Sequence, residues 1–297
     1  MRIKVIVNPG AGQPEPVLSI LNDAFGGAGI EWDVAVTHGP GDGYDAARQA
    51  AGEGYDLIGA YGGDGTVSEV ASALALGGPP MAVLPGGTGN ALADDLGIPN
   101  NLVEATALVA GGTYDLRSVD MGRVGDGLFI LRLTMGFEAS VVEAATRELK
   151  ERFGWLAYAL AGLQALKDPP TAAYRIDVDG KTVEAPGVAC IVANSSSTGV
   201  LGVRIAEGVD VSDGLLDVII IESTDLVSLA GGAADAAAGQ LPRVMSRWRG
   251  TRIRVESRPE QSVLTDGESR GTTPVDVAVV PGAIRVVVPK GAGPAPD

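Results

Sequence analysis

The chain has 297 residues, which is long enough for two domains with substantial cores. Its formal net charge of −15 argues against nucleic acid as a partner and against simple electrostatic attraction to anionic lipid. The single cysteine, Cys190, excludes an intrachain disulfide and a thiolate zinc cluster, and its apolar surroundings favour a buried structural thiol. The single histidine, His38, is not accompanied by a Gly-x-Ser-x-Gly elbow, so a carboxylate is favoured as any general base.

The N-terminal residues run directly into a strand pattern. No signal peptide precedes that strand, and no apolar run approaches the length of a membrane span. These features predict a cytoplasmic protein without a transmembrane segment.

Strand and helix patterns alternate through the first half of the chain. Strands are expected at Ile3–Val7, Trp32–Thr37, Asp56–Tyr61 and Met81–Leu84, and helices at Val17–Phe25, Tyr44–Ala51, from Thr66 onward, Ala91–Leu96 and Leu102–Val109. This alternation predicts an α/β fold with a doubly wound parallel sheet that helices cover on both faces.

Glycine-rich turns follow three of these strands. The most informative is Gly62-Gly63-Asp64-Gly65-Thr66, which leads directly into a helix whose start Thr66 and Glu69 could fix as a capping box. Backbone amides at a helix N-terminus bind phosphate, and glycine lets the phosphate approach closely. A turn that binds nothing is an equal alternative for this motif alone. The further turns at 85–90 and 8–12 should lie at the same sheet edge, and they favour phosphate binding.

From about residue 115 short apolar runs recur, separated by hairpin turns. The runs are Ser118–Val124, Leu128–Thr134, Tyr174–Val178, Gly187–Ala193, Leu216–Ile221, Thr251–Glu256, Val275–Val280 and Ile284–Val288, with Pro281-Gly282 as the turn between the last two. They predict an antiparallel β-sandwich interrupted by helical insertions at Ser140–Leu166 and Asp225–Met245. The expected domains are a nucleotide-binding domain at 1–120, a sandwich domain at 121–290 and a tail at 291–297.

Several motifs together resemble the diacylglycerol kinase and sphingosine kinase superfamily, and most closely its soluble bacterial lipid kinases. The motifs are Asn8-Pro9 with Gly12, the loop Gly62 to Ser68, Thr88-Gly89-Asn90, Lys150 through Tyr158, Ser212 through Asp217, and Asp266-Gly267-Glu268. The match runs through nearly the whole chain, although Ala11 stands where the family usually has serine.

The resemblance implies ATP as phosphoryl donor, Mg²⁺ as cofactor, and a lipid acceptor such as diacylglycerol or a sphingoid base. The residues that it implies for nucleotide contact are Asn8, Pro9, Gly10, Thr37, Gly62, Gly63, Asp64, Gly65, Thr66, Val67, Ser68 and Thr88. Glu268 aligns with the family's proton acceptor, and Asp64 with an acid that organises catalytic magnesium and water. Asp210, Asp213 and Leu215 align with a separate structural magnesium site, to which Asp210 and Leu215 would offer backbone carbonyls.

One position departs from the pattern of soluble bacterial diacylglycerol kinases, which usually carry aspartate directly after the Thr-x-Asn turn. Ala91 stands there in this chain, and the turn looks like the sphingosine and ceramide kinase version. Asp94, one helical turn later, could substitute if the helix orientation allows it. The acceptor lipid is therefore left open.

Other interpretations stay open beside the lipid kinase. A NAD kinase shares the Gly-Gly-Asp-Gly-Thr turn, and a catalytically silent nucleotide-binding sensor would fit the loss of aspartate at Ala91. The insertion 140–166 is either an amphipathic lid over an acyl chain or a helix packed on the sandwich. The expected partner is a lipid at a membrane surface, reached by transient peripheral contact, and a homodimer is also left open.

Overall fold

The computed structural model describes residues 1–12, 15–136, 171–198, 204–222 and 245–292. The predicted insertion at 140–166 lies outside these residues, and so does the insertion at 225–245 apart from Met245, which begins a strand. No helix in the described ranges is long and apolar enough to cross a membrane.

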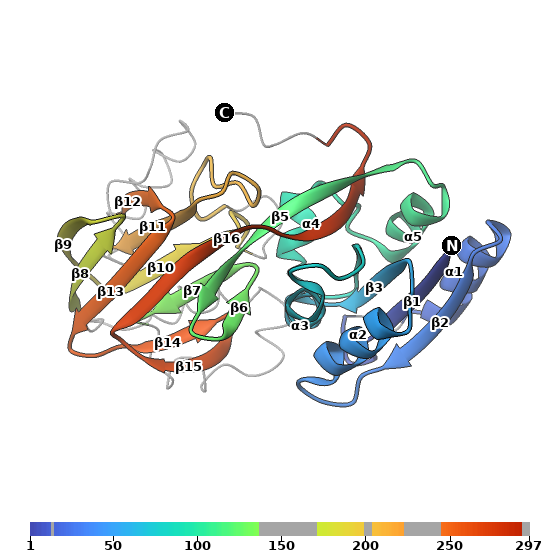
Figure 1. The fold of residues 1–297 in the computed structure, drawn as a ribbon, viewed down its shortest axis with the longest axis horizontal. Coiled ribbons are helices and arrows are strands. Elements are labelled where there is room, and N and C mark those ends of the chain that lie inside the picture. Colours follow the sequence, from blue (N-terminus) through green and yellow to red (C-terminus); the bar gives the residue numbers. More distant parts are fainter. Residues whose placement is uncertain (13–14, 137–170, 199–203, 223–244, 293–297) are drawn as a thin grey trace.

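The first half of the chain is a parallel α/β unit, as predicted. Its strands are β1 (Arg2–Val7), β2 (Glu31–Val36), β3 (Leu57–Gly62) and β4 (Met81–Pro85), and they lie in the order β2-β1-β3-β4. Every residue of β3 and β4 is buried, which is what a parallel strand covered on both faces requires. Figure 1 shows this unit at one end of the molecule.

Helices pack around this sheet in two groups. One group is α1 (Val17–Leu21), its continuation η1 (Asn22–Gly26) as a π-helical turn, and α5 (Leu102–Ala110). The other is α2 (Asp42–Gly52) and α3 (Asp64–Leu74), which pack together against β1, β3 and β4. The short helix α4 (Ala91–Asp95) follows β4.

The second half is built from antiparallel strands, which confirms the predicted sandwich. One sheet has the order β12-β11-β10-β7-β14-β15, and its pairings are antiparallel throughout. Its strands are β7 (Arg132–Met135), β10 (Ala189–Ala193), β11 (Leu216–Ile221), β12 (Met245–Gly250), β14 (Ser262–Thr265) and β15 (Glu268–Thr272). The strands of the facing layer are β5 (Tyr114–Val124), β6 (Gly127–Phe129), β8 (Ala172–Val178), β9 (Lys181–Gly187), β13 (Arg252–Arg258) and β16 (Val275–Pro289).

An apolar core fills the space between the two layers of the sandwich. Phe129, Leu133, Tyr174 and Val255 are fully or almost fully buried in it. Cys190 is part of the same core, where burial raises the pKa of its thiol, as expected for an inert structural cysteine.

The long strand β16 corrects one prediction. Two strands separated by a turn at Pro281-Gly282 were expected, but residues 275–289 form one strand with an irregularity between Val280 and Ile284. The strand stays continuous because both of its halves pair with β5, as expected of a bulge that bends a strand without ending it.

This strand also joins the two halves of the molecule. Val286 of β16 pairs in parallel with Met81 of β4, so the parallel sheet and the sandwich layer form one ten-stranded sheet. The orange-red strand β16 and the green strand β5 run side by side between the two ends of the molecule in Figure 1. Residue 120, near which the domain boundary was predicted, lies inside β5.

Candidate functional site

The three glycine turns lie together at the carboxyl edge of the parallel strands. Asn8 Nδ2 donates a hydrogen bond of 3.0 Å to Thr66 Oγ1 and so links the first turn to α3. A Cβ added to Gly12 would lie 1.8 Å from the carbonyl oxygen of Gly86, and one added to Gly87 would lie 2.5 Å from the Cα of Gly63. Only glycine permits backbone contacts this close, and the predicted convergence of the turns is therefore confirmed.

Helix α3 begins at Asp64 rather than after Thr66, and the predicted capping box is wrong. Its N-cap residue is Gly63, and no side chain in the described part of the chain caps the helix. The Thr66 hydroxyl instead accepts a hydrogen bond from the Asn8 side chain. The carboxylate of Glu69 accepts hydrogen bonds from the N–H groups of Gly41 and Gly43 at 2.8 and 2.9 Å. The first turn of α3 therefore presents backbone N–H groups that no capping side chain covers, which suits an anionic ligand.

Asp64 lies at this helix start and is partly buried. Its Oδ1 accepts a 2.7 Å hydrogen bond from the backbone N–H of Ala91, so the residue that replaces the usual aspartate still contacts it. Burial raises the pKa of Asp64, whereas the Ala91 N–H and the positive charge of Arg132 act to lower it, and the nearby Asp266 and Asp95 raise it.

The second turn is closed by its own asparagine. Asn90 Oδ1 accepts from the Gly87 N–H at 3.1 Å, and Asn90 Nδ2 donates to the Gly87 carbonyl at 2.7 Å and to Asn100 Oδ1 at 2.6 Å. These bonds leave Thr88 exposed at the tip of the turn.

A hairpin of the sandwich reaches the same edge. The turn Asp266-Gly267 joins β14 to β15, and both residues have positive φ, of 47° and 92°. The Asp266 carboxylate accepts from the N–H groups of Ile130, Leu131 and Arg132 at 2.9 to 3.1 Å, and from Ser68 Oγ at 2.5 Å. Asp266 therefore fastens the sandwich to the helix that carries Asp64.

Glu268 follows this turn on β15. Its side chain is 58% exposed, and its Oε2 lies 3.2 Å from Nη2 of Arg270. Glu268 lines a hollow of about 440 Å³ together with Gly65 and Ser68, whereas Asp64 lines a smaller cavity next to it. Asp266 lines both, so the two predicted catalytic acids line neighbouring cavities that share Asp266.

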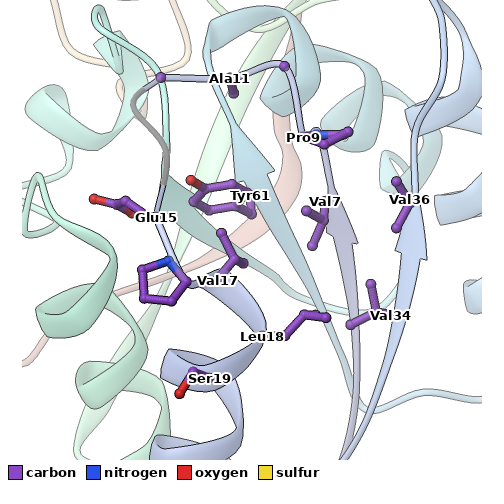
Figure 2. Close-up of a pocket in the computed structure, with 13 residues that line it drawn as sticks. Val7, Pro9, Ala11, Glu15, Val17, Leu18, Ser19, Val34, Val36 and Tyr61 are labelled. Carbon is purple, nitrogen blue, oxygen red and sulfur yellow. The ribbon is translucent and has the colours of Figure 1, made fainter.

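A second hollow, of about 640 Å³, adjoins the first glycine turn. Figure 2 shows Pro9, Ala11 and the ring of Tyr61 around it, with Val34 and Val36 of β2 on its far side. Gly10 also lines it. Predicted nucleotide contacts are thus distributed between this hollow and the one beside Gly65.

Three predicted nucleotide contacts have buried side chains, namely Thr37, Thr66 and Val67. Thr37 is buried after β2, with its N–H donating to the carbonyl of Val7 at 2.9 Å. Val67 packs in the core of the α/β unit.

Two family models match the chain over nearly its full length. Residues 2–124 match the diacylglycerol kinase catalytic domain, and residues 132–288 match the YegS C-terminal NAD kinase beta sandwich-like domain. The chain belongs to the diacylglycerol kinase family. This membership confirms the resemblance read from the motifs and assigns the chain to the lipid kinases.

Individual relatives agree with this assignment. A diacylglycerol kinase of Bacillus subtilis is 30% identical, with 97% of each chain covered. A protein of Pseudomonas aeruginosa named "Probable lipid kinase YegS-like" is 34% identical over 89% of this chain and 87% of its own length. An uncharacterized protein of Synechocystis is also 34% identical over 82% of this chain, which spans 57% of that relative's length. The crystal structure of a diacylglycerol kinase from Bacillus anthracis superimposes with a TM-score of 0.84 at 26% identity, covering 98% of both chains.

The residues of the predicted structural magnesium site lie in one segment of turns before β11 in this diacylglycerol kinase homologue. The carboxylate of Asp210 accepts from the Ser212 N–H at 2.9 Å and from Arg117 Nη2 at 2.5 Å. Asp213 accepts from the Leu215 N–H at 2.9 Å and is paired with Arg249. The carboxylate that the prediction assigns to the ion, that of Asp213, is thus paired with a guanidinium. The other two predicted ligands are the backbone carbonyls of Asp210 and Leu215, and the site stays a prediction.

Three features of the site were missed from the sequence. Asp95, not Asp94, turns toward the sandwich, where its carboxylate accepts from Ser195 Oγ at 2.5 Å and from the Ser196 N–H at 3.0 Å. The polar run 194–198 that receives it is buried. Arg132 is buried next to Asp64. Two features of the sequence could have indicated them. One is the polar run 194–198 directly after an apolar strand, and the other is the charged Arg132 inside the apolar run 128–134.

Proposed function

We propose that this protein is an ATP- and magnesium-dependent lipid kinase, which transfers the γ-phosphate to the hydroxyl of a lipid such as diacylglycerol or a sphingoid base. The observation that carries the proposal is the convergence of three glycine turns around the uncapped start of α3, with Asp64 as the first residue of that helix. Family membership supplies the reaction class.

In this proposal the backbone N–H groups at 63–66 bind the phosphates, because phosphoryl transfer depends mainly on positioning and charge neutralisation. Asp64 would hold the nucleotide's magnesium, since one of its carboxylate oxygens is free of the Ala91 bond and the residue lines the small cavity. When bound, the ion would neutralise charge on the phosphates. The second magnesium at Asp210, Asp213 and Leu215 stays a prediction, with the arginine pairs as its competitors.

Glu268 would take the proton of the acceptor hydroxyl. The bond between the hydroxyl oxygen and the γ-phosphorus forms as the bond to the β,γ-bridging oxygen breaks, and ADP leaves. The exposure of Glu268 supports this role, because an acceptor held in a membrane has to reach the base from outside. With a net charge of −15, transient contact of a cytoplasmic enzyme with that surface would rest on apolar groups.

Transfer of labelled γ-phosphate from ATP with magnesium tests the proposal. The acceptor panel contains diacylglycerol, monoacylglycerol, sphingosine and ceramide, with NAD as a further acceptor. Asp64→Asn is the blank, because its amide oxygen can still accept from Ala91 while the charge is lost. We expect a labelled lipid with the native chain and none with the variant. If NAD were the only labelled product, the protein would be a NAD kinase. If ATP bound but no product formed, the protein would be a catalytically silent nucleotide-binding sensor.

Glu268→Gln tests the base. Turnover should be abolished, with ATP affinity nearly unchanged, because the substitution removes only the proton acceptor. Glu256→Gln is a matched control, since Glu256 also pairs with the arginine two residues away, Arg254, at 3.1 Å. Each of these exposed ion pairs contributes less than about 1 kcal/mol to the free energy of unfolding. Both variants should therefore unfold at the same urea concentration as the native chain. Loss of ATP binding together with turnover would instead make Glu268 structural.

A further inference from the structure

Arg132 is a charged residue at a position where the fold gives it little solvent. It begins β7, its side chain belongs to a residue that is 6% exposed, and it lies between fully apolar neighbours in the sequence. One guanidinium nitrogen, Nη2, donates to the carbonyl of Ser197, while Nε is buried and has no hydrogen-bond partner among the described residues. A buried donor that lacks a partner costs about 1–3 kcal/mol, and more when it is charged.

The charge of Arg132 is balanced only at a distance. Asp64, Asp266 and Asp95 all act on the guanidinium electrostatically, yet no ion pair or hydrogen bond joins the guanidinium to a carboxylate within the described residues. The Asp266 carboxylate already accepts hydrogen bonds from three backbone N–H groups, that of Arg132 among them, and from Ser68 Oγ. Burial lowers the pKa of the guanidinium, because it removes water from around the charged form.

Arg132 lines a small cavity in which charged and hydroxyl side chains meet. Asp64, Arg132, Thr134, Thr198 and Asp266 line it with Leu131 and Gly267, and it measures about 50 Å³. One water needs about 10–15 Å³ on such a measure, so the space suits a group of a few heavy atoms and excludes an acyl chain. The cavity combines a carboxylate suited to a metal with a guanidinium suited to an anion, and it adjoins the start of α3 where phosphate binding is proposed.

We propose that Arg132 contacts the transferred phosphoryl group, with its Nε–H donating to a phosphoryl oxygen; this inference rests on the proposed kinase function. The planar guanidinium forms strong charge-assisted hydrogen bonds to phosphate oxygens. Its proton stays on the arginine throughout, and no covalent step passes through it. The bond supplies positive charge where negative charge spreads over the phosphoryl oxygens during transfer.

Substitution of Arg132 separates this role from a purely structural one. Arg132→Gln removes the charge, and Arg132→Lys keeps the charge but lacks the Nε–H. For each variant we would measure kcat, the Kd for ATP, the Kd for ADP with aluminium fluoride as a mimic of the transferring group, and the urea midpoint. Arg247→Gln is the control, because Arg247 is another poorly exposed sandwich arginine whose partners, Asp217 and the carbonyls of 207 and 208, lie outside the cavity.

For Arg132→Gln we expect kcat to fall about 100- to 1,000-fold and the ADP–aluminium fluoride complex to weaken by a similar factor, with ATP affinity changed less than about threefold. Arg132→Lys should recover part of both losses. Arg247→Gln should lower the urea midpoint without weakening the fluoride complex.

Equal binding of ADP–aluminium fluoride by the native chain and Arg132→Gln would overturn the inference, and so would a loss fully explained by unfolding. The proposed function fails in a different way, namely when the native chain binds neither ATP nor the fluoride complex, or phosphorylates no lipid.

Discussion

Gly65 occupies a helical position where a side chain would stabilise the fold and obstruct the ligand. It lies in the first turn of α3, and a Cβ built on it meets no atom of the described residues within 4 Å. Alanine in place of glycine inside a helix stabilises it by up to about 1 kcal/mol. The fold therefore does not require glycine at position 65. We expect a bound phosphate to fill the open space beside it.

Gly65→Ala should consequently raise stability and lower ATP affinity in the same protein. We expect the free energy of unfolding in urea to rise by about 0.5–1 kcal/mol, and the Kd for ATP from calorimetry to rise at least about tenfold because the methyl group stands where the phosphate approaches. Gly27→Ala is the matched control, because Gly27 ends η1 with helical φ and ψ of −63° and −28° and also has open space around its Cβ. A Gly65→Ala variant that binds ATP like the Gly27→Ala variant would contradict the assignment of the glycine loop.

At the scale of elements, the sequence predicted those whose pattern is local. The buried run of β3, the glycines after it and the apolar spacing of α3 identified a strand–turn–helix unit correctly. The strand β15 was missed because all five of its residues, Glu268–Thr272, are exposed and give no apolar alternation. The break expected at Pro281-Gly282 was a bulge, because pairing with β5 overrides the local turn chemistry.

The same distinction separates the site residues that were predicted from those that were missed. Asp64 stands inside a glycine motif, so its place at a helix start could be read locally. The role of Asp95 depends on contacts with Ser195 and Ser196, which lie 100 and 101 positions later in the sequence. The role of Arg132 depends on a cavity that residues of both halves line. The capping box failed for a related reason, since Asn8 and the loop before α2 compete for Thr66 and Glu69 from outside the helix.

At the scale of the whole molecule, the α/β unit and the sandwich are joined as one structure. They share β5 and β16 along a continuous sheet. Hydrogen bonds between Ser68 and Asp266 and between Asp95 and Ser195 add contacts across the site itself. Because separation of the halves would break sheet pairing and expose the edge of β4, neither half should unfold while the other stays native.

Two tryptophans allow this coupling to be measured from each side. Trp32 lies in β2 and packs edge-on against Phe25 in the α/β unit, whereas Trp248 lies in β12 of the sandwich. Two variants each keep one of the three tryptophans of the chain. The variant with Trp155→Phe and Trp248→Phe reports only on Trp32, and the variant with Trp155→Phe and Trp32→Phe reports only on Trp248. We expect each protein's fluorescence midpoint in urea to match its own far-UV dichroism midpoint, with the same slope from both probes. A Trp32 transition displaced from the dichroism transition would show that the α/β unit unfolds by itself, and that the shared strands β5 and β16 do not couple the nucleotide half to the acceptor half.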